Sequence, residues 1–181
     1  MPYWLMALCL LSGAPVGAGE SPAPGGHVHG SSTLRIRVDG PRLMIQLEGP
    51  AGNFIGFEHP PVEPEETAQL AMTLDVLRAG NNLFLTPPAA ACRMASAAAS
   101  PPEYQSDGRT PGHADLKASW DFRCGNPAAL MWIDAQVLAL FPGTKQLAAS
   151  SVTPSGQKAV VLTPGTPRVL LPWPAARGNR R

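Results

Sequence analysis

The sequence predicts an α+β fold, mostly antiparallel β-sheet with one main helix packed on one face of the sheet. Short segments in which apolar and polar residues alternate are separated by Gly- and Pro-rich turns, which is typical of strands with one buried face. A single longer segment, residues 64–79, has the spacing of an amphipathic helix instead. With 18 Gly and 21 Pro in 181 residues, the composition also favours a turn-rich β fold over a helical bundle.

Two alternating segments near the N-terminus predict a β-hairpin. Leu34, Ile36 and Val38 are separated by charged residues, and residues 43–48 repeat the alternation. The Asp-Gly-Pro sequence at 39–41 between them is a turn signal. We therefore expect two adjacent strands with one buried face at the start of the domain.

The predicted main helix covers residues 64–79. Pro64 suits the first helical position, and the two glutamates that follow it complement the positive end of the helix dipole. Leucines spaced by four and three residues give the helix one apolar face. Gly80 suits the position just after the last turn.

The clearest alternation lies in residues 115–124. Its apolar residues, which include Trp120 and Cys124, fall on one face, and its charged residues fall on the other. Residues 96–112 are rich in Ala, Ser, Pro and Gly, and are predicted to form a mobile surface loop. The other predicted elements are short: strands or turns at 83–86 and 89–94, a strand and a helical turn within 130–142, a hairpin at 145–163 and a last strand at 169–171.

The N-terminus is similar to a secretory signal peptide. Residues 4–11 form a short apolar run, and residues 16–18 have the small-x-small form that signal peptidase accepts, so we expect cleavage after Ala18. This run is too short to span a membrane, and no other segment is apolar over a sufficient length. The expected plan is a signal peptide at 1–18, a flexible arm with His-x-His at 19–31, a single domain at 32–173 and a basic tail at 174–181.

The exported chain would retain two cysteines, Cys92 and Cys124. An even number in an oxidising compartment favours a disulfide. Cys124 points towards the core in the predicted strand, where Cys92 could meet it from a neighbouring strand. The alternative is a pair of buried free thiols. Because there is no Cys-x-x-Cys, neither a zinc ribbon nor a thioredoxin-type redox site is indicated.

Charge and motifs exclude some functions. The chain has 14 basic and 13 acidic residues, and this balance gives no support to nucleic-acid binding. There is no His-Glu-x-x-His and no Gly-x-Ser-x-Gly motif. No catalytic residue is therefore predicted, and we do not expect an enzyme.

Four histidines are the candidate metal ligands. His27 and His29 lie two residues apart just before the first strand, and side chains at such spacing in an extended chain point to the same side. Zinc accepts neutral imidazole readily, so the pair could supply two arms of a zinc site. The alternative is a solvated chain end of no consequence. Equally, His59 could cap a turn before two prolines, and His113 could be a solvated loop residue.

Several motifs together resemble the ZrgA-like family of zinc-regulated periplasmic proteins from Gram-negative bacteria. They are His27-Val28-His29-Gly30 before a hairpin, Gly56-Phe57-Glu58-His59-Pro60, Cys92, His113-Ala114-Asp115 leading to Trp120-Asp121-Phe122-Arg123-Cys124, and Leu140-Phe141-Pro142. The likeness covers about residues 27–171, and Gly-Phe-Glu-His-Pro is its most specific part. It implies a periplasmic zinc-binding protein that helps zinc acquisition alongside a high-affinity zinc importer, with a component of that importer as a possible partner.

One departure limits what the resemblance implies. Better-known members carry a long His/Asp/Glu-rich run in the central loop, whereas the matching segment here, residues 96–112, contains no histidine. The resemblance therefore does not extend to multi-zinc storage or handover that depends on such a run. The four histidines outside that loop remain.

The placement of these histidines and the resemblance lead to one hypothesis for the site. The four histidines are expected to supply at least three ligands of one zinc ion. Glu58 or Asp115 would be an additional ligand, or an acceptor that orients a histidine. Two other classes stay open: a structural or partner-binding domain in which the histidines are incidental, and a zinc-dependent hydrolase with Glu58 as general base, which the missing motifs disfavour.

Overall fold

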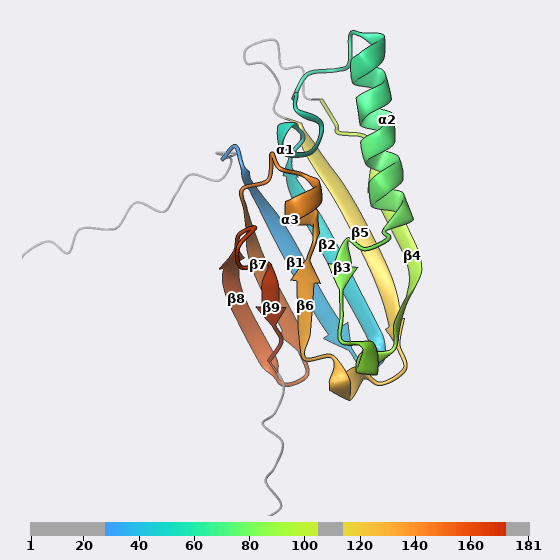
Figure 1. Ribbon diagram of the computed structural model, residues 1–181, viewed down its shortest axis with the longest axis vertical. Coiled ribbons are helices and arrows are strands. Elements are labelled where there is room, and N and C mark those ends of the chain that lie inside the picture. Colours follow the sequence, from blue (N-terminus) through green and yellow to red (C-terminus); the bar gives the residue numbers. More distant parts are fainter. Residues whose placement is uncertain (1–27, 105–113, 173–181) are drawn as a thin grey trace, which may run out of the picture.

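The computed structural model describes residues 28–104 and 114–172 (Figure 1). The predicted signal peptide, the basic tail, His27 and His113 lie outside these residues. Within them, the strands are β1 (Ser31–Asp39), β2 (Arg42–Pro50), β3 (Phe84–Leu85), β4 (Cys92–Ser100), β5 (Asp115–Cys124), β6 (Trp132–Ala135), β7 (Gln146–Thr153), β8 (Gly156–Leu162) and β9 (Arg168–Leu170). The helices are α1 (Gly52–Ile55), α2 (Pro64–Ala79) and α3 (Val137–Leu140), with 3₁₀ turns η1 (Pro88–Ala90) and η2 (Pro127–Ala129).

The strands form two sheets. The large sheet has the order β4-β5-β2-β1-β7-β8, and the small sheet has the order β3-β6-β9. The small sheet lies in front of the large one in Figure 1, and α2 lies beside β4. Every pairing is antiparallel except that of β1 with β7, which is parallel. The predicted class, an α+β fold with mostly antiparallel sheet and one main helix, is confirmed.

The core lies between the large sheet and the layer that covers it. Alternate residues of the first hairpin face this core: Leu34, Ile36 and Ile45 are almost fully buried, while their neighbours in the sequence are not. Trp120 on β5 joins the layers, because its ring packs edge-on to Phe84 with centroids 4.9 Å apart. The alternation predicted from the sequence therefore marks the buried face of the large sheet.

Helix α2 begins and ends at the predicted residues. A capping box joins Glu63 and Glu66 at its start, and Gly80 takes the left-handed conformation at its end, with φ of 64°. The indole N–H of Trp120 donates to the carbonyl of Leu77 at 2.8 Å and ties the last turn of the helix to the core. Among the described residues, no helix has the length and apolar character needed to cross a membrane.

Some details differ from the sequence prediction. Strand β4 continues to Ser100, into the segment expected to be loop from residue 96, because its backbone keeps pairing with β5 from Ser96 to Ser100 after a register shift between Met94 and Ser96. Helix α3 begins at Val137, two residues before the helical turn that the sequence predicts at 139–142. Helix α1 was not predicted, since four residues are too short to show a helical period. The parallel pairing of β1 with β7 was not predicted either, because alternation does not specify a partner.

The predicted disulfide between Cys92 and Cys124 is present. The two residues lie directly opposite each other where β4 begins and β5 ends. The bridge therefore links the start of the edge strand β4 to the last residue of β5.

We expect that removing this bridge destabilises the fold without changing it. In the chain-entropy model, closing a loop of this length stabilises the folded state by about 3–4 kcal/mol. The double variant Cys92→Ala/Cys124→Ala should therefore show a matching loss in the free energy of unfolding by urea titration. An unfolding midpoint that is the same for oxidised wild type, reduced wild type and the double variant would contradict this.

Candidate metal-binding site

One end of the large sheet gathers the chain segments that carry the candidate ligands. Strands β1, β5 and β7 begin there and β2 ends there, as the pairing of Pro50 with Asp115 and of Ser31 with Gln146 shows. This is the upper end in Figure 1, with α1 above β2 and the start of α2 beyond it. Residues far apart in the sequence are thus neighbours at this end.

The side chain of Asn53 in α1 holds the start of β1 in place. Its Oδ1 accepts the N–H of Gly30 at 2.7 Å, and its Nδ2 donates to the carbonyl of Ser31 and to the hydroxyl of Ser32, both at 3.0 Å. Asn53 is only 4% exposed, so these bonds are shielded from water. Because a buried amide is costly unless it is bonded, this side chain favours one position of residues 30–32.

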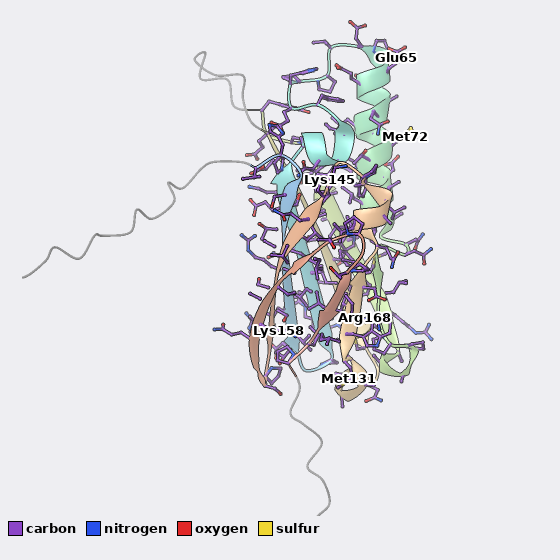
Figure 2. All side chains as sticks on the ribbon, turned by 60° about the vertical axis from the view of Figure 1, so that its left-hand side comes forward. Glu65, Met72, Met131, Lys145, Lys158 and Arg168 are labelled. Carbon is purple, nitrogen blue, oxygen red and sulfur yellow. A yellow bond between two sulfur atoms is a disulfide. The ribbon has the colours of Figure 1, made fainter. Side chains whose placement is uncertain are left out.

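The turn before β1 is also fixed from the other side. Gly30 has φ of 82°, a conformation that favours glycine, and its carbonyl accepts the N–H groups of Lys145 and Gln146 at 2.7 and 3.0 Å. The ammonium of Lys145 is held 2.7 Å from the carbonyl of Pro142. Figure 2 labels Lys145 close to α1 at this end of the molecule. His29, next to Gly30, therefore extends from a well-fixed backbone.

The structure brings His29 and Glu58 together. His29 Nδ1 lies 3.3 Å from Glu58 Oε1. The imidazole is largely exposed, at 71%, whereas the carboxylate side chain is 16% exposed. Both residues line an open pocket of about 530 Å³ that also includes Asn53 and Lys145. A Cβ at Gly52 would lie 3.1 Å from Glu58 Oε1, so the absence of a side chain at Gly52 lets the carboxylate lie against α1.

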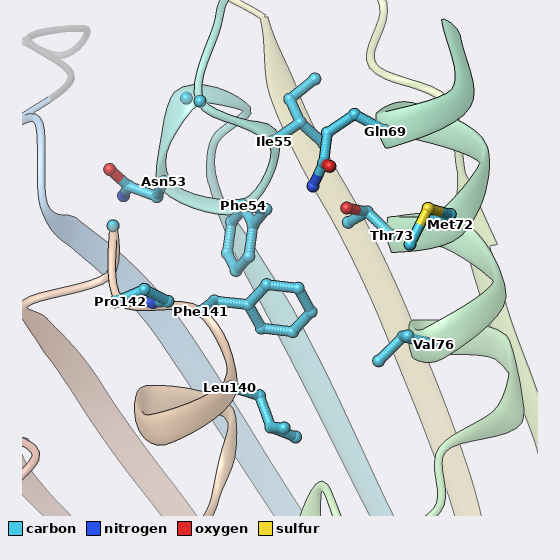
Figure 3. Close-up of a pocket in the computed structure, with 13 residues that line it drawn as sticks. Asn53, Phe54, Ile55, Gln69, Met72, Thr73, Val76, Leu140, Phe141 and Pro142 are labelled. Carbon is cyan, nitrogen blue, oxygen red and sulfur yellow. The ribbon is translucent and has the colours of Figure 1, made fainter. Parts of the chain in front are cut away.

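A second pocket, of about 430 Å³, lies between α1, α2 and the turn after α3 (Figure 3). Phe54 and Phe141 pack edge-to-face within it, with centroids 5.5 Å apart. Met72 and Leu140 are exposed at its rim. No imidazole or carboxylate lines this pocket, so it offers no candidate metal ligand; the contact of Phe54 with Phe141 joins α1 to the turn after α3.

His59 makes different contacts from His29. Its ring stacks on Phe57 with centroids 5.2 Å apart, and its Nε2 lies 3.6 Å from Glu66 Oε1 at the start of α2. Its Nδ1 lies 3.0 Å from the carbonyl of Pro60. Although Glu58 and His59 are consecutive, their side chains contact different partners.

Asp115 lies at the same end of the sheet, half-buried at the start of β5. The preceding residue, Ala114, accepts the N–H of Ala51 at 2.7 Å, which places the start of β5 next to the start of α1. Within residues 28–104 and 114–172, no three His, Cys, Asp or Glu side chains form a group that could hold a metal ion. Of the predicted ligands that the structure describes, His29 and Glu58 therefore form one close pair. Asp115 lies at the same end of the sheet, and His59 contacts Glu66 instead.

The spacing of the His29–Glu58 pair suits a zinc ion. Zinc bonds to imidazole nitrogen and carboxylate oxygen are about 2.1 Å long, so two such ligand atoms at tetrahedral angles lie roughly 3.4 Å apart. The measured separation between His29 Nδ1 and Glu58 Oε1 is 3.3 Å. The separation of the two atoms is thus compatible with a shared ion as well as with a direct ion pair.

Comparison with protein families now decides the identity of the domain. The model of the ZrgA family zinc uptake proteins matches residues 26–171. The chain belongs to this family. The match begins just before the His-x-His pair and ends with the last strand, so it includes both sheets and the candidate site. A comparison with curated proteins gave no match.

Membership in the ZrgA family links the fold to zinc acquisition, in agreement with the family suggested by the sequence motifs. Sequence reasoning nevertheless missed the contacts of two residues at this end, Asn53 and Glu66. Asn53 carried no signal, because a lone asparagine in an unpredicted turn is indistinguishable from a solvated one. Glu66 was read only as a helix-start carboxylate, and its contact with His59 depends on how the chain turns at Pro60.

We expect Asn53→Ala to weaken both the fold and zinc binding at His29. The substitution leaves the buried N–H of Gly30 and the carbonyl of Ser31 without their partner, which should cost about 2–4 kcal/mol in the free energy of unfolding. Urea unfolding and zinc titration would measure the two effects. Asn81→Ala is the matched control, because Asn81 is exposed in a turn. Equal stability of the two variants would show that the amide does not hold the site.

Proposed function

We propose that this protein is an exported, periplasmic zinc-binding protein that assists zinc acquisition, and that zinc is its cargo. The observation that supports this most directly is the His29–Glu58 pair, whose ligand atoms are at the separation that zinc requires. Its place in a family of zinc uptake proteins supplies the choice of ion.

His29 and Glu58 would be the core of the zinc site, with His27 and His113 completing it. His27 precedes the fixed turn by two residues in the sequence, and His113 directly precedes Ala114, which is bonded to Ala51 beside α1. The described residues near these histidines in the sequence, His29 and Ala114, lie at the end of the sheet where Glu58 lies. Three imidazoles and one carboxylate are a ligand set that suits zinc.

Asp115 would act on the site through a histidine. Histidines that bind a metal commonly give their second N–H to a carboxylate, which fixes the ring and raises the basicity of the other nitrogen. Asp115 begins β5 two residues after His113 and is half-buried, so its carboxylate is held by the sheet. Its role is therefore orientation of an imidazole.

An acquisition role also fits the exposure of the site. His29 is largely exposed while Glu58 is anchored against α1, so the ion could be reached from solvent and passed to a partner, such as a component of a zinc importer. The disulfide between Cys92 and Cys124 agrees with export into an oxidising compartment. We propose binding and delivery rather than catalysis.

Zinc titration calorimetry would test the proposed site. His29→Ala and Glu58→Gln should each lower zinc affinity by about tenfold to a hundredfold, because each removes a ligand or its charge. Lys145→Met is the control in the same pocket: it removes a charge without removing a proposed ligand. Unchanged affinity in both ligand variants would reject the site and favour a structural or partner-binding domain.

Zinc should also stabilise the fold, and acid should remove this effect. An ion that binds only the folded chain raises stability by about 2.7 kcal/mol at a free concentration one hundred times its Kd. Protons compete with zinc for imidazole nitrogen, so affinity should fall as the pH is lowered through about 6.5. Thermal unfolding with and without zinc at pH 7.5 and pH 5.5 would measure both effects. A zinc-induced rise in Tm that is equal at the two pH values would argue against histidine ligands.

A further inference from the structure

The large sheet has one face that the other layer leaves open. The small sheet lies against its opposite face (Figure 1), and the side chains that alternate with the core residues point away from it. Arg35, Arg37 and Gln46 lie on the central strands β1 and β2, and all three are exposed. Residues in the middle of a sheet stay exposed only where nothing covers them. Within the described part of the chain, this open face is therefore a solvent-accessible surface.

Three arginines form a row across three neighbouring strands of the open face. Arg42 on β2 is directly opposite Arg123 on β5, and Arg123 is directly opposite Arg93 on β4. Like charges directly opposite each other destabilise a sheet. The row therefore lowers the stability of the free protein unless anions lie beside it.

Carboxylates of the chain neutralise only part of this charge. Arg42 Nε lies 2.9 Å from Asp121 Oδ1, and Arg35 Nη1 lies 2.9 Å from Glu48 Oε2. Three other guanidinium groups on this face have no carboxylate within ion-pair distance among residues 28–104 and 114–172: those of Arg37, Arg93 and Arg123. The open face thus retains several cations that an anion from outside can reach.

A hollow of about 580 Å³ adjoins the row on this face. Its lining includes Arg35, Arg37 and Arg42, together with one carboxylate, that of Asp39. The hollow therefore has an excess of positive charge. Because a guanidinium group can donate two parallel hydrogen bonds to one carboxylate, the hollow suits an acidic side chain.

The open face also carries groups that a uniformly anionic partner would not match. Arg37 is flanked by Met44 on β2 and by Val152 on β7, and Val152 is 48% exposed. The carboxylates of Glu48 and Asp121 lie among the cations. An anionic membrane or polysaccharide is repelled by these carboxylates, whereas a protein can match charged and apolar groups one by one. Arginine and methionine are also enriched at protein interfaces.

We propose that the open face of the large sheet is a docking surface for an acidic segment of a partner protein. Carboxylates of that segment bind the three arginines that lack an ion pair, and its apolar side chains pack on Met44 and Val152. Arg123 lies next to Cys124, at the opposite end of β5 from Asp115 and the candidate zinc ligands. The surface is therefore separate from the zinc site, and the inference does not rest on zinc binding.

NMR titration of the ¹⁵N-labelled full chain with a synthetic acidic peptide would test this proposal. The probe is a soluble peptide of glutamate, serine and leucine, and its matched control has glutamine in place of each glutamate. The acidic peptide should shift the amide resonances of β1, β2 and β5 around the arginine row, and added salt should weaken the binding. The glutamine peptide should leave these resonances unchanged. Equal binding of the two peptides would overturn the proposal.

Single substitutions would locate the binding surface. Arg37→Gln and Arg123→Gln should each lower the affinity for the acidic peptide by about threefold to tenfold, because each removes a charged donor from an exposed pair. Lys158→Gln is the matched control. It removes the same charge from β8, where Lys158, labelled in Figure 2, pairs with the buried Ser151 and so lies on the other side of the sheet. Arginine variants that bind the peptide as Lys158→Gln does would overturn the proposal.

Thermal unfolding separates a docking role from a structural one. Arg123→Gln removes a like-charge contact on each side, so it should raise Tm at low salt while it lowers peptide affinity. A lower Tm with unchanged peptide affinity would make Arg123 a structural residue and overturn the proposal. Binding to phosphatidylglycerol vesicles without binding to the peptide would also overturn it, in favour of a membrane surface. All of these measurements are made without zinc, so their failure would leave the proposed zinc site untouched.

Discussion

The end of the large sheet that carries the candidate ligands depends on one interaction, the hydrogen bonds of the buried Asn53 amide. Its three hydrogen bonds to residues 30–32 join the short helix α1 to the first strand. Gly143 packs against the backbone of Asn53 so closely that a Cβ there would collide with it, which brings the turn before β7 into the same cluster. Three segments far apart in sequence thus meet at Asn53, whose side chain bonds the first and whose backbone contacts the third, and His29 extends from the first of them.

The consecutive residues Glu58 and His59 contact different partners: Glu58 contacts His29, and His59 contacts Glu66. The stack of His59 on Phe57 directs this ring towards α2, while Glu58 contacts His29. Each of these two histidines therefore lies beside one carboxylate. The motif that looked like one ligand cluster in the sequence therefore becomes two His–carboxylate pairs in space.

The candidate ligands and the disulfide lie at opposite ends of the large sheet. Cys92 and Cys124 close the far end of β4 and β5, whereas Asp115 lies where β5 begins. Rearrangement of the candidate ligands on metal binding would therefore leave the covalent link unaffected. The segment 96–112, which begins within β4, carries no histidine.

The sequence by itself determined the α+β class, the buried face of each long strand, the bounds of α2 and the pairing of Cys92 with Cys124, because each depends on local periodicity, capping residues or a count of cysteines. It also determined the family, through short motifs such as Gly-Phe-Glu-His-Pro. Only the tertiary structure decided which carboxylate meets which histidine. The parallel pairing of β1 with β7, the turn at Pro60 and the bonds of Asn53 set those contacts. They join residues that are distant in sequence, or they depend on a backbone turn, and neither leaves a periodic signal in the chain.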